Sequence, residues 1–359
     1  QDKPSPWPGS LIIADLTGDG RADLLLLGAE AILLWRQDAQ GDLQGPSRYP
    51  LADRDAYGPR LCDVDGDGQL DLLYQVPNHK FSLRLRRNLQ GEFGPEILLR
   101  SENWRGELQT LGQGPTGLVV AGIQERSGLI ETFTLAAKDR EDRFSAIAPR
   151  TYATGADVHA ELAWVLADLD GDGRDDLVIA DRRVPRLSLF RQMAGGRFQE
   201  AQQFPSVSDI RGLAAIRLAA DQPPQLVVSS AAEHSLGLVR LTPEGRLSYP
   251  EPLPTVGTPE LVAAGELAGA GSLSIIYVSE GEGQRVLRRL NQDAEGKWVT
   301  EALPGSEMKS LPRMLLLADL DQDGRQDILT GNPGETPRVL WQRPDGWQNL
   351  EAGPARLSL

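Results

Sequence analysis

Short apolar runs recur along the chain and alternate with polar turns that are rich in Gly and Asp. Residues 11–13, 24–27 and 118–120 are typical, because each run is too short for a helix and ends at turn-forming residues. The contents of Gly (38) and Pro (25) are high, and helix-like periodicity is scarce. The pattern therefore predicts an all-β chain of many short strands, with no apolar run long enough to cross a membrane as a helix.

Four of the turns between these runs share one acidic pattern, Asp-x-Asp/Thr-x-Asp-Gly-x-x-Asp. They span residues 15–23, 63–71, 168–176 and 319–327. The side chains at positions 1, 3 and 5 of a tight turn point inward together, and Gly at position 6 allows a left-handed bend. The backbone carbonyl at position 7 and the Asp at position 9 can complete a shell of oxygen ligands, which is the coordination that calcium prefers.

Two other interpretations of these turns are weaker. An EF-hand requires Glu at position 12 and a helix on each side, whereas position 12 here is Leu26, Tyr74, Ile179 or Thr330. Asp-Gly turns are also common in simple hairpins, but four copies with their acids in phase argue against solvated turns alone. The sequence therefore predicts a unit made of a strand, a calcium loop and a second strand.

The same unit recurs with most of its acids lost at residues 109, 217 and 266, so the seven units begin at residues 15, 63, 109, 168, 217, 266 and 319. Each unit continues into a further apolar strand and a hairpin, which makes four strands, A to D. A solenoid also has a fixed period, but its repeats are shorter and carry fewer strands. We therefore expect a single seven-bladed β-propeller of four-stranded blades, with the calcium loops between strands A and B. The expected domain is 1–359, with approximate blades 9–52, 53–100, 101–152, 153–206, 207–254, 255–304 and 305–359. How the ring closes is left open; residues 1–8 or 353–359 are candidates for an additional strand.

This arrangement resembles the FG-GAP and VCBS-type repeats of integrin α-subunit heads and of many secreted bacterial proteins. The resemblance covers residues 9 to about 352, and the short repeats with Gly-x-Phe hairpins are more similar to the bacterial type. It implies about four structural calcium ions on one face, with weaker binding in the first loop, where a Thr replaces an Asp. The implied side-chain ligands are Asp15, Thr17, Asp19, Asp23, Asp63, Asp65, Asp67, Asp71, Asp168, Asp170, Asp172, Asp176, Asp319, Asp321, Asp323 and Asp327, with the backbone carbonyls of Arg21, Gln69, Arg174 and Arg325.

The formal net charge of −14 argues against binding to nucleic acid or to anionic membrane surfaces. Four bound calcium ions would reduce this charge to about −6, so we interpret the acidity as a metal signature. The single cysteine, Cys62, precedes a calcium loop where three other copies have Ala, which predicts a small buried residue. Direct insertion into a membrane is not expected. Because weak calcium loops fill at extracellular calcium concentrations, we expect an extracellular or periplasmic location, either as a secreted protein or as the ectodomain of a larger one.

The loops that join strand D to A and strand B to C are expected on the face opposite the calcium loops. The resemblance places partner binding on that face, and loops on a rigid scaffold commonly carry function. The candidate ligand-binding residues are Tyr57, Arg60, His79, Trp104, Arg105, His159, Arg182, Arg183 and His234. For each there is a bland alternative: the three histidines can be unrelated surface residues, and Trp104 can fill a gap between blades.

Two classes of function are compatible with these features. The favoured one is a calcium-stabilised, non-catalytic binding or adhesion module for a protein or a glycan. The alternative is a secreted polysaccharide-active enzyme, a lyase or a hydrolase, for which Asp157, His159 and Glu161 form the compact candidate cluster. No nucleophile elbow, phosphate loop or zinc signature accompanies that cluster, which leaves the binding module as the better prediction.

Overall fold

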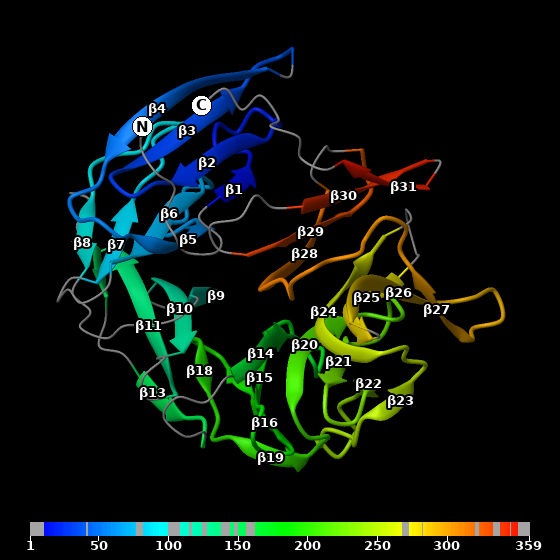
Figure 1. The fold of residues 1–359 in the computed structure, drawn as a ribbon. Coiled ribbons are helices and arrows are strands. Elements are labelled where there is room, and N and C mark those ends of the chain that lie inside the picture. The colour runs from blue at the N-terminus through cyan, green and yellow to red at the C-terminus, as the bar shows by residue number, and fades with distance from the viewer. Residues whose placement is uncertain are drawn as a thin grey trace. The chain divides into compact units, whose positions relative to one another are not determined.

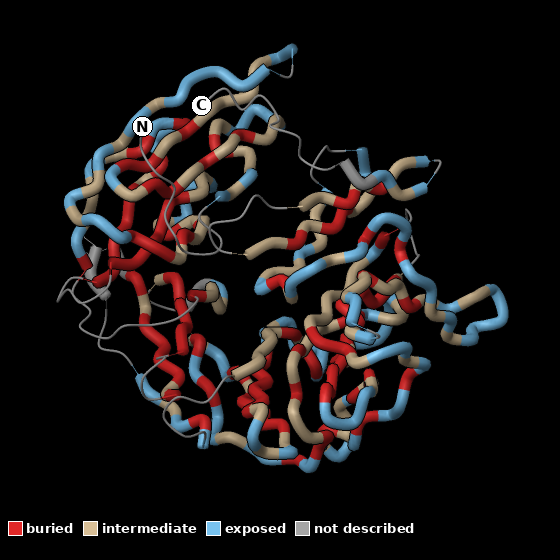
Figure 2. The backbone as a smooth tube through the Cα atoms, in the orientation of Figure 1, coloured by how far each residue is buried: buried red, intermediate tan, exposed pale blue. Residues whose placement is uncertain are grey.

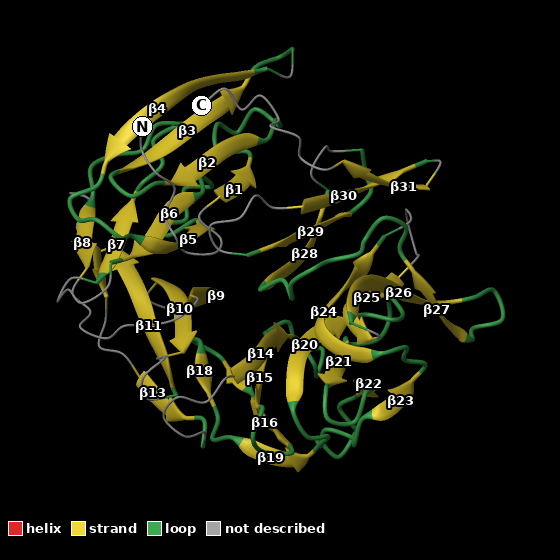
Figure 3. Cartoon of the chain, in the orientation of Figure 1, coloured by secondary structure: helices red, strands yellow, loops and turns green. Residues whose placement is uncertain are grey.

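Seven antiparallel four-stranded blades make up the chain, which is an all-β, seven-bladed β-propeller (Figures 1 and 3). In each blade the strands pair in the order A, B, C and D. The part of the chain that is described contains no helix long and apolar enough to cross a membrane. The computed structural model describes residues 11–40, 42–76, 82–99, 108–114, 117–123, 128–137, 144–146, 150–155, 162–267, 273–281, 283–319, 323–332, 338–344 and 346–350.

The chain divides into two compact units, and the first contains three blades. It comprises residues 1–159 together with 193–197. Strand D of blade 3 is split, since two short segments pair with different parts of the same strand C. The strands of this unit are, in blade 1, β1 (Leu11–Ala14), β2 (Asp23–Leu27), β3 (Ala31–Gln37) and β4 (Leu43–Pro50); in blade 2, β5 (Tyr57–Cys62), β6 (Asp71–Gln75), β7 (Leu83–Arg86) and β8 (Ile97–Leu99); and in blade 3, β9 (Leu108–Gly114), β10 (Gly117–Ile123), β11 (Leu129–Ala137), β12 (Phe144–Ala146) and β13 (Arg150–Ala153).

The second unit contains four blades and comprises residues 160–192 and 198–359. Its strands A adjoin one another in sequence order, because β14 contacts β20, β20 contacts β24 and β24 contacts β28. The strands are, in blade 4, β14 (Leu162–Ala167), β15 (Asp176–Asp181), β16 (Arg186–Phe190) and β19 (Gln202–Pro205); in blade 5, β20 (Ile210–Ile216), β21 (Gln225–Ser230), β22 (Ser235–Val239) and β23 (Glu251–Leu253); in blade 6, β24 (Thr258–Glu266), β25 (Leu273–Gly281), β26 (Gln284–Gln292) and β27 (Trp298–Ala302); and in blade 7, β28 (Met314–Ala318), β29 (Asp327–Gly331), β30 (Arg338–Arg343) and β31 (Gly346–Leu350). A hairpin of β17 (Gln192–Met193) and β18 (Arg197–Phe198) follows strand C of blade 4, and its residues 193–197 belong to the first unit.

The hydrophobic core lies between consecutive blades within each unit. One cluster, for example, joins Leu25 and Leu34 of blade 1 to Leu72 and Tyr74 of blade 2. Strands B such as β6 and β15 are buried along their whole length, while the turns are exposed (Figure 2). For β6 the cause is that blades 1 and 3 cover its two faces. Burying one Leu in this way stabilises the fold by about 1.5–3 kcal/mol, so packing of blade on blade supplies the main stabilising term.

Asn88 connects two neighbouring blades at the end of strand C in blade 2. Its side-chain amide donates to the carbonyl of Leu16 in blade 1 at 2.8 Å and to the carbonyl of Leu70 at 3.3 Å. Its amide oxygen accepts the N–H of Gly91 at 2.8 Å, and the residue is 1% exposed. Asn88 therefore satisfies backbone groups that would otherwise be buried without partners.

We expect Asn88→Ala to lower the free energy of unfolding by about 1–3 kcal/mol, since it leaves buried carbonyl and N–H groups unpaired. Urea unfolding followed by circular dichroism measures this change. Asn291→Ala is the matched control, because that amide makes a single exposed bond to the carbonyl of Gln292. Equal stabilities of the two variants would contradict the bridging role of Asn88.

Candidate metal centres

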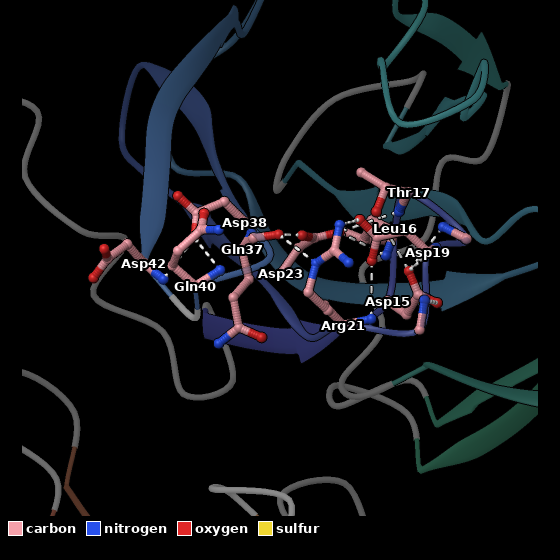
Figure 4. A network of polar contacts seen from close by, with 12 residues as sticks. Asp15, Leu16, Thr17, Asp19, Arg21, Asp23, Gln37, Asp38, Gln40 and Asp42 are labelled. Atoms are coloured by element: carbon pink, nitrogen blue, oxygen red, sulfur yellow. Dashed lines mark hydrogen bonds and ion pairs between the residues drawn. The ribbon is translucent and has the colours of Figure 1, made fainter.

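The first acidic loop wraps the carboxylate of Asp15 in backbone N–H groups (Figure 4). Asp15 accepts the N–H of Gly18 at 2.7 Å, of Asp19 at 3.1 Å and of Gly20 at 2.8 Å. Gly18 and Gly20 have φ of 75° and 84°, values that L side chains rarely adopt. Slight burial opposes ionisation, but these N–H donors outweigh it and lower the pKa of Asp15. The loop is therefore shaped around an ionised carboxylate.

The other three acidic loops repeat this wrapping around their first Asp. In each, the N–H groups at positions 5 and 6 donate to the Asp at position 1, at 2.9–3.1 Å. Four turns far apart in the sequence thus adopt one geometry, because each has Gly at position 6 and Asp at position 1. The donor and acceptor pairs are Asp67 and Gly68 to Asp63, Asp172 and Gly173 to Asp168, and Asp323 and Gly324 to Asp319.

The Asp at position 9 opens strand B and is almost completely buried in all four blades: Asp23, Asp71, Asp176 and Asp327. In each case one carboxylate oxygen accepts a backbone N–H from the end of strand C, at 2.8–3.0 Å. The register is also the same, since each Asp lies opposite a small residue at the end of strand A. This Asp therefore fixes the acidic loop, strand B and strand C at a single point.

Carboxylate oxygens gather in two of the loops closely enough to hold a metal ion. In blade 2 the oxygens of Asp63, Asp65 and Asp71 lie within 4.8 Å of one another, and in blade 4 those of Asp168, Asp170 and Asp172 do so. Within the residues that the structure describes, these two are the groups of acidic side chains that lie close enough together to hold a metal ion. Blade 1 has Thr17 in place of the second acid, and Asp321 of blade 7 lies outside the described residues.

Two of the buried acids are not fully compensated by hydrogen bonds. Burial, with smaller contributions from the neighbouring acids, raises the pKa of Asp71 and of Asp176 to about 6. One carboxylate oxygen of Asp176 is buried and has no hydrogen-bond partner among the described residues. A buried carboxylate in this condition is stabilised by a nearby cation. With oxygen donors alone, the set fits a hard cation of the calcium type.

Arginine side chains occupy the same carboxylates that a metal ion would contact. The Arg at position 7 folds back onto the Asp at position 5 in three loops, pairing Arg21 with Asp19, Arg174 with Asp172 and Arg325 with Asp323. Figure 4 draws the first of these pairs. These guanidinium groups are stand-in cations, because they neutralise an oxygen shell that otherwise holds only negative charge.

A second arginine, at the end of strand C, reaches position 3 of the loop in blades 2 and 4. Arg87 pairs with Asp65, and Arg191 pairs with Asp170 at 3.3 Å. In blade 1 position 3 is uncharged, and the equivalent Arg36 instead donates to the carbonyl of Gly91 in blade 2 at 2.5 Å. This arginine thus contacts its own loop where position 3 is an acid, and Arg191 also reaches the carbonyl of Gly245 in the next blade at 3.1 Å.

The eroded loop of blade 5 closes without an acidic shell. Arg217 stands at position 1 and donates to the carbonyl of Gln222 at 2.7 Å. Position 9 is Gln225, which pairs with Ile216 in the same register as the buried Asp of the other blades. The strand register is therefore kept without the charges, whereas the loop lacks the left-handed residues that the acidic loops of blades 1, 2 and 4 have at positions 4 and 6.

Cys62 lies at the end of β5, directly opposite Asp71. It is 6% exposed, and burial, followed by the charges of Asp71 and Asp63, raises the pKa of its thiol to about 12. The expected small buried residue is what the structure contains, and a protonated thiol of this kind is unreactive.

Two candidate ligand-binding residues do not lie on an exposed surface. Tyr57 is the first residue of β5 and is 5% exposed, so it cannot offer its ring to a sugar or to a partner. Arg60 lies in the same strand, and its guanidinium donates to the carbonyl of Leu108 at 2.5 Å. Their selection as loop residues was wrong, because the strand begins at Tyr57 and a register irregularity between Tyr57 and Arg60 keeps both within the sheet.

The other candidates on the D–A and B–C loops fall into two groups. Arg182, Arg183 and His234 lie in the loops of blades 4 and 5, where Arg182 pairs with Asp209 at 3.3 Å. Arg183 is half-exposed beside Asp181, and His234 is exposed. The remaining candidates lie outside the described residues, as does the possible catalytic cluster: His79, Trp104, Arg105 and His159, and Asp157 and Glu161.

Sequence reasoning missed the partners that strand C supplies to the acidic loops. The N–H groups that reach the buried Asp belong to three Gln residues and one Asn, each directly after an Arg or a Trp. This recurrence of an amide residue at the end of strand C was the available signal. The four residues are Gln37, Asn88, Gln192 and Gln342.

The blades and the acidic A–B loops together define a β-propeller with repeated candidate cation loops. Residues 15–74 match the profile of the FG-GAP-like repeat, and residues 315–346 match that of the FG-GAP repeat. The chain is thus an FG-GAP-type repeat β-propeller. Among curated proteins, no sequence matches the chain.

Solved structures share the fold at low sequence identity. An Agrocybe aegerita lectin, described for specific recognition of non-reducing terminal N-acetylglucosamine, is 17% identical with a TM-score of 0.57, covering 81% of this chain and 79% of the lectin. BBS1N, crystallised in complex with ARL6DN, is 16% identical with a TM-score of 0.50, covering 92% of this chain and 88% of BBS1N. At these identities the likeness concerns the fold alone.

We expect Asp176→Asn to reduce the number of calcium ions bound per chain by one, because it removes the buried carboxylate oxygen that has no hydrogen-bond partner. Asp175→Asn is the matched control: it changes the adjacent acid, at a position where the other loops have Ala, Leu or Gln. Metal analysis after gel filtration measures the stoichiometry. Loss of an ion from both variants, or from neither, would refute the assignment.

We expect Arg174→Ala to tighten calcium binding by a factor of about 1.4 to 5, because the exposed guanidinium competes for Asp172 with an energy of about 0.2–1 kcal/mol. Isothermal titration calorimetry measures the change. Arg186→Ala is the control, since Arg186 lies in the same blade but contacts Gln203 instead of the loop. Weaker calcium binding by Arg174→Ala would show that this arginine supports the site.

Proposed function

We propose that this chain is a calcium-stabilised, non-catalytic binding module for a protein or a glycan. The observation that carries the proposal is the recurring acidic loop, in which three carboxylates gather closely enough to hold a cation in blades 2 and 4 and a buried Asp opens strand B. Asp176 is the clearest example of such a buried Asp, because one of its carboxylate oxygens has no hydrogen-bond partner among the described residues. If the A–B loops of an FG-GAP-type propeller bind cations, the D–A and B–C loops at the other end of the blades are available for recognition.

Calcium is the cation that the donor set favours. Each complete loop offers carboxylates at positions 1, 3, 5 and 9 and a carbonyl at position 7, and calcium accepts six to eight such oxygens in flexible geometry. Magnesium requires a near-ideal octahedron of shorter bonds. We propose up to four sites, of which the first is the weakest, because Thr17 supplies a neutral oxygen. When bound, calcium would neutralise the acidic shell and stiffen the loop.

An extracellular or periplasmic location follows from the proposed metal. Loops of this kind depend on calcium at extracellular concentrations, which far exceed those of a resting cytosol. The net charge of −14 further disfavours nucleic acid and anionic membranes as partners. The proposed partner is therefore a protein or a glycan met outside the cytoplasm.

Recognition is assigned to the D–A and B–C loops because they differ from blade to blade, unlike the repeated A–B loops. Arg182, Arg183 and His234 carry charge and hydrogen-bonding groups on these loops in the second unit. The Agrocybe aegerita lectin gives a precedent for glycan recognition by a chain of similar fold. The fold alone does not assign a function, so the proposal depends on these side chains.

We expect removal of calcium to lower the melting temperature, because an ion that binds only the native state stabilises it by mass action. One site contributes about 2.7 kcal/mol at a free calcium concentration one hundred times its Kd. Scanning calorimetry of the dialysed protein, with and without added calcium, measures the shift, and magnesium serves as the control.

The same samples applied to an array of glycans and matrix proteins test whether binding requires calcium. An unchanged melting temperature would refute the calcium proposal, and a blank array with a folded protein would refute the binding module.

A further inference from the structure

Two loop residues of blade 5 adopt a backbone conformation that favours glycine. Asp209, directly before strand A, has φ of 47°, and His234, directly before strand C, has φ of 48°. Blade 6 has Gly at both equivalent positions, Gly257 and Gly283, with φ of 73° and 76°. Residues other than Gly are strained in this region, although Asp and His tolerate it better than most. Blade 5 thus has an Asp and a His side chain at two strained positions where blade 6 has glycine.

Hydrogen bonds join these two strained loops, residues 208–209 and 231–234, into one unit that we call the platform. The N–H of Ala231 donates to the carbonyl of Asp209 at 3.1 Å, and the N–H of Ser208 donates to Glu233 at 2.9 Å. The imidazole Nδ1 of exposed His234 lies 2.6 Å from the hydroxyl of Thr258 in blade 6. The imidazole is therefore held at the surface by the hydroxyl of Thr258 from the next blade, while the loop that carries it is bonded to the D–A loop of its own blade.

A row of alternating charges runs beside this platform. Asp209 pairs with Arg182 at 3.3 Å and accepts two hydrogen bonds from Arg211, at 2.8 and 2.9 Å. Arg211 also contacts Glu260 at 3.3 Å, and burial raises the pKa of Glu260. Glu280 also acts on Arg211 and Glu260, and it is paired with Arg285 at 2.9 Å. Three guanidinium groups and three carboxylates are therefore balanced, and Glu233 adds one negative charge beside them.

β-Bulges set the positions of two residues of this charged row, Arg211 and Glu260. The register of β20 shifts between Ile210 and Gly212, which leaves Arg211 as the additional residue. The register of β24 shifts between Pro259 and Val262, where Glu260 lies. A bulge redirects the side chain it carries, and bulges are frequent beside functional sites. The same local device therefore acts at the start of strand A in two adjacent blades.

The chemistry of this group points to a neutral ligand rich in hydroxyl groups. This near-balance of charge gives no strong field that would favour an anion or a cation. Guanidinium donors, carboxylate acceptors and the nearby Ser and Thr hydroxyls match a ligand that is both donor and acceptor at closely spaced positions. We propose that the D–A and B–C loops of blades 4 to 6 form a binding site for a neutral saccharide, centred on His234, Asp209 and Arg211, with buried Glu260 holding Arg211 in place. This inference rests on the proposed binding function and assigns its ligand class and position.

The decisive variant is His234→Gly, because it separates recognition from folding. Glycine is what blade 6 has at this position, so the substitution relieves strain and the melting temperature should stay unchanged or rise. Binding to immobilised neutral oligosaccharides should weaken at least tenfold. Gln90→Gly is the matched control, since Gln90 is also left-handed, with φ of 58°, but lies in the C–D turn of blade 2. It should leave saccharide binding unchanged.

The probes are oligosaccharides ending in N-acetylglucosamine, glucose or mannose, compared with sulfated and sialylated chains by biolayer interferometry. Asp209→Asn is a second variant that keeps a residue tolerant of the left-handed region, and it should also weaken binding. Wild-type affinity in both variants would overturn the inference. If only charged glycans or proteins bind, the inference fails while the binding module stands; if nothing binds and calcium still stabilises the fold, both fail.

Discussion

The buried Asp at the start of strand B is the constraint on which the acidic loops depend. In four blades it receives an N–H from strand C and lies opposite a small residue of strand A, so three strands are fixed by one carboxylate. A buried carboxylate is costly unless donors or cations surround it. The raised pKa values of Asp71 and of Asp176 show that hydrogen bonds do not fully offset the cost of burying these carboxylates. In the three eroded blades the position is Gly117, Gln225 or Ser274, and the requirement for a compensating cation disappears with the charge.

The arginines around the loops are a second consequence of this constraint. Those at position 7 fold onto their own loop, and those at the end of strand C reach either the loop or the neighbouring blade. Arg191 does both, since it pairs with Asp170 and donates to the carbonyl of Gly245 in blade 5 at 3.1 Å. The charge state of a loop is thereby linked to a contact between blades. Such pairs are weak individually because they are solvated, but they recur at equivalent positions.

The two loop ends of the blades differ in a way that matters for function. The four acidic A–B ends repeat one pattern of backbone hydrogen bonds, as expected for a structural element, whereas the A–B loop of blade 5 keeps the strand register without their left-handed residues. The D–A and B–C ends vary, and in blade 5 they carry strained Asp209 and His234 beside a balanced row of charges. Strain that a glycine would relieve is a reason to look for function at this end. An FG-GAP-type propeller can serve many partners, so specificity lies in these irregular loops.

The sequence by itself determined the repeated features: short strands, seven units and the phase of the acids. These follow from local chemistry, since a nine-residue loop contains its own glycine bend and carboxylates, and apolar runs report burial directly. Only the tertiary structure decided which side chains meet. Tyr57 is buried because an irregular strand and a neighbouring blade cover it, which no local pattern reveals. Likewise Arg182, Asp209, Arg211 and Glu260 come from three blades and form one row through strand pairing and bulges. Contacts between blades depend on register and packing across long sequence separations, and these lie beyond any single repeat.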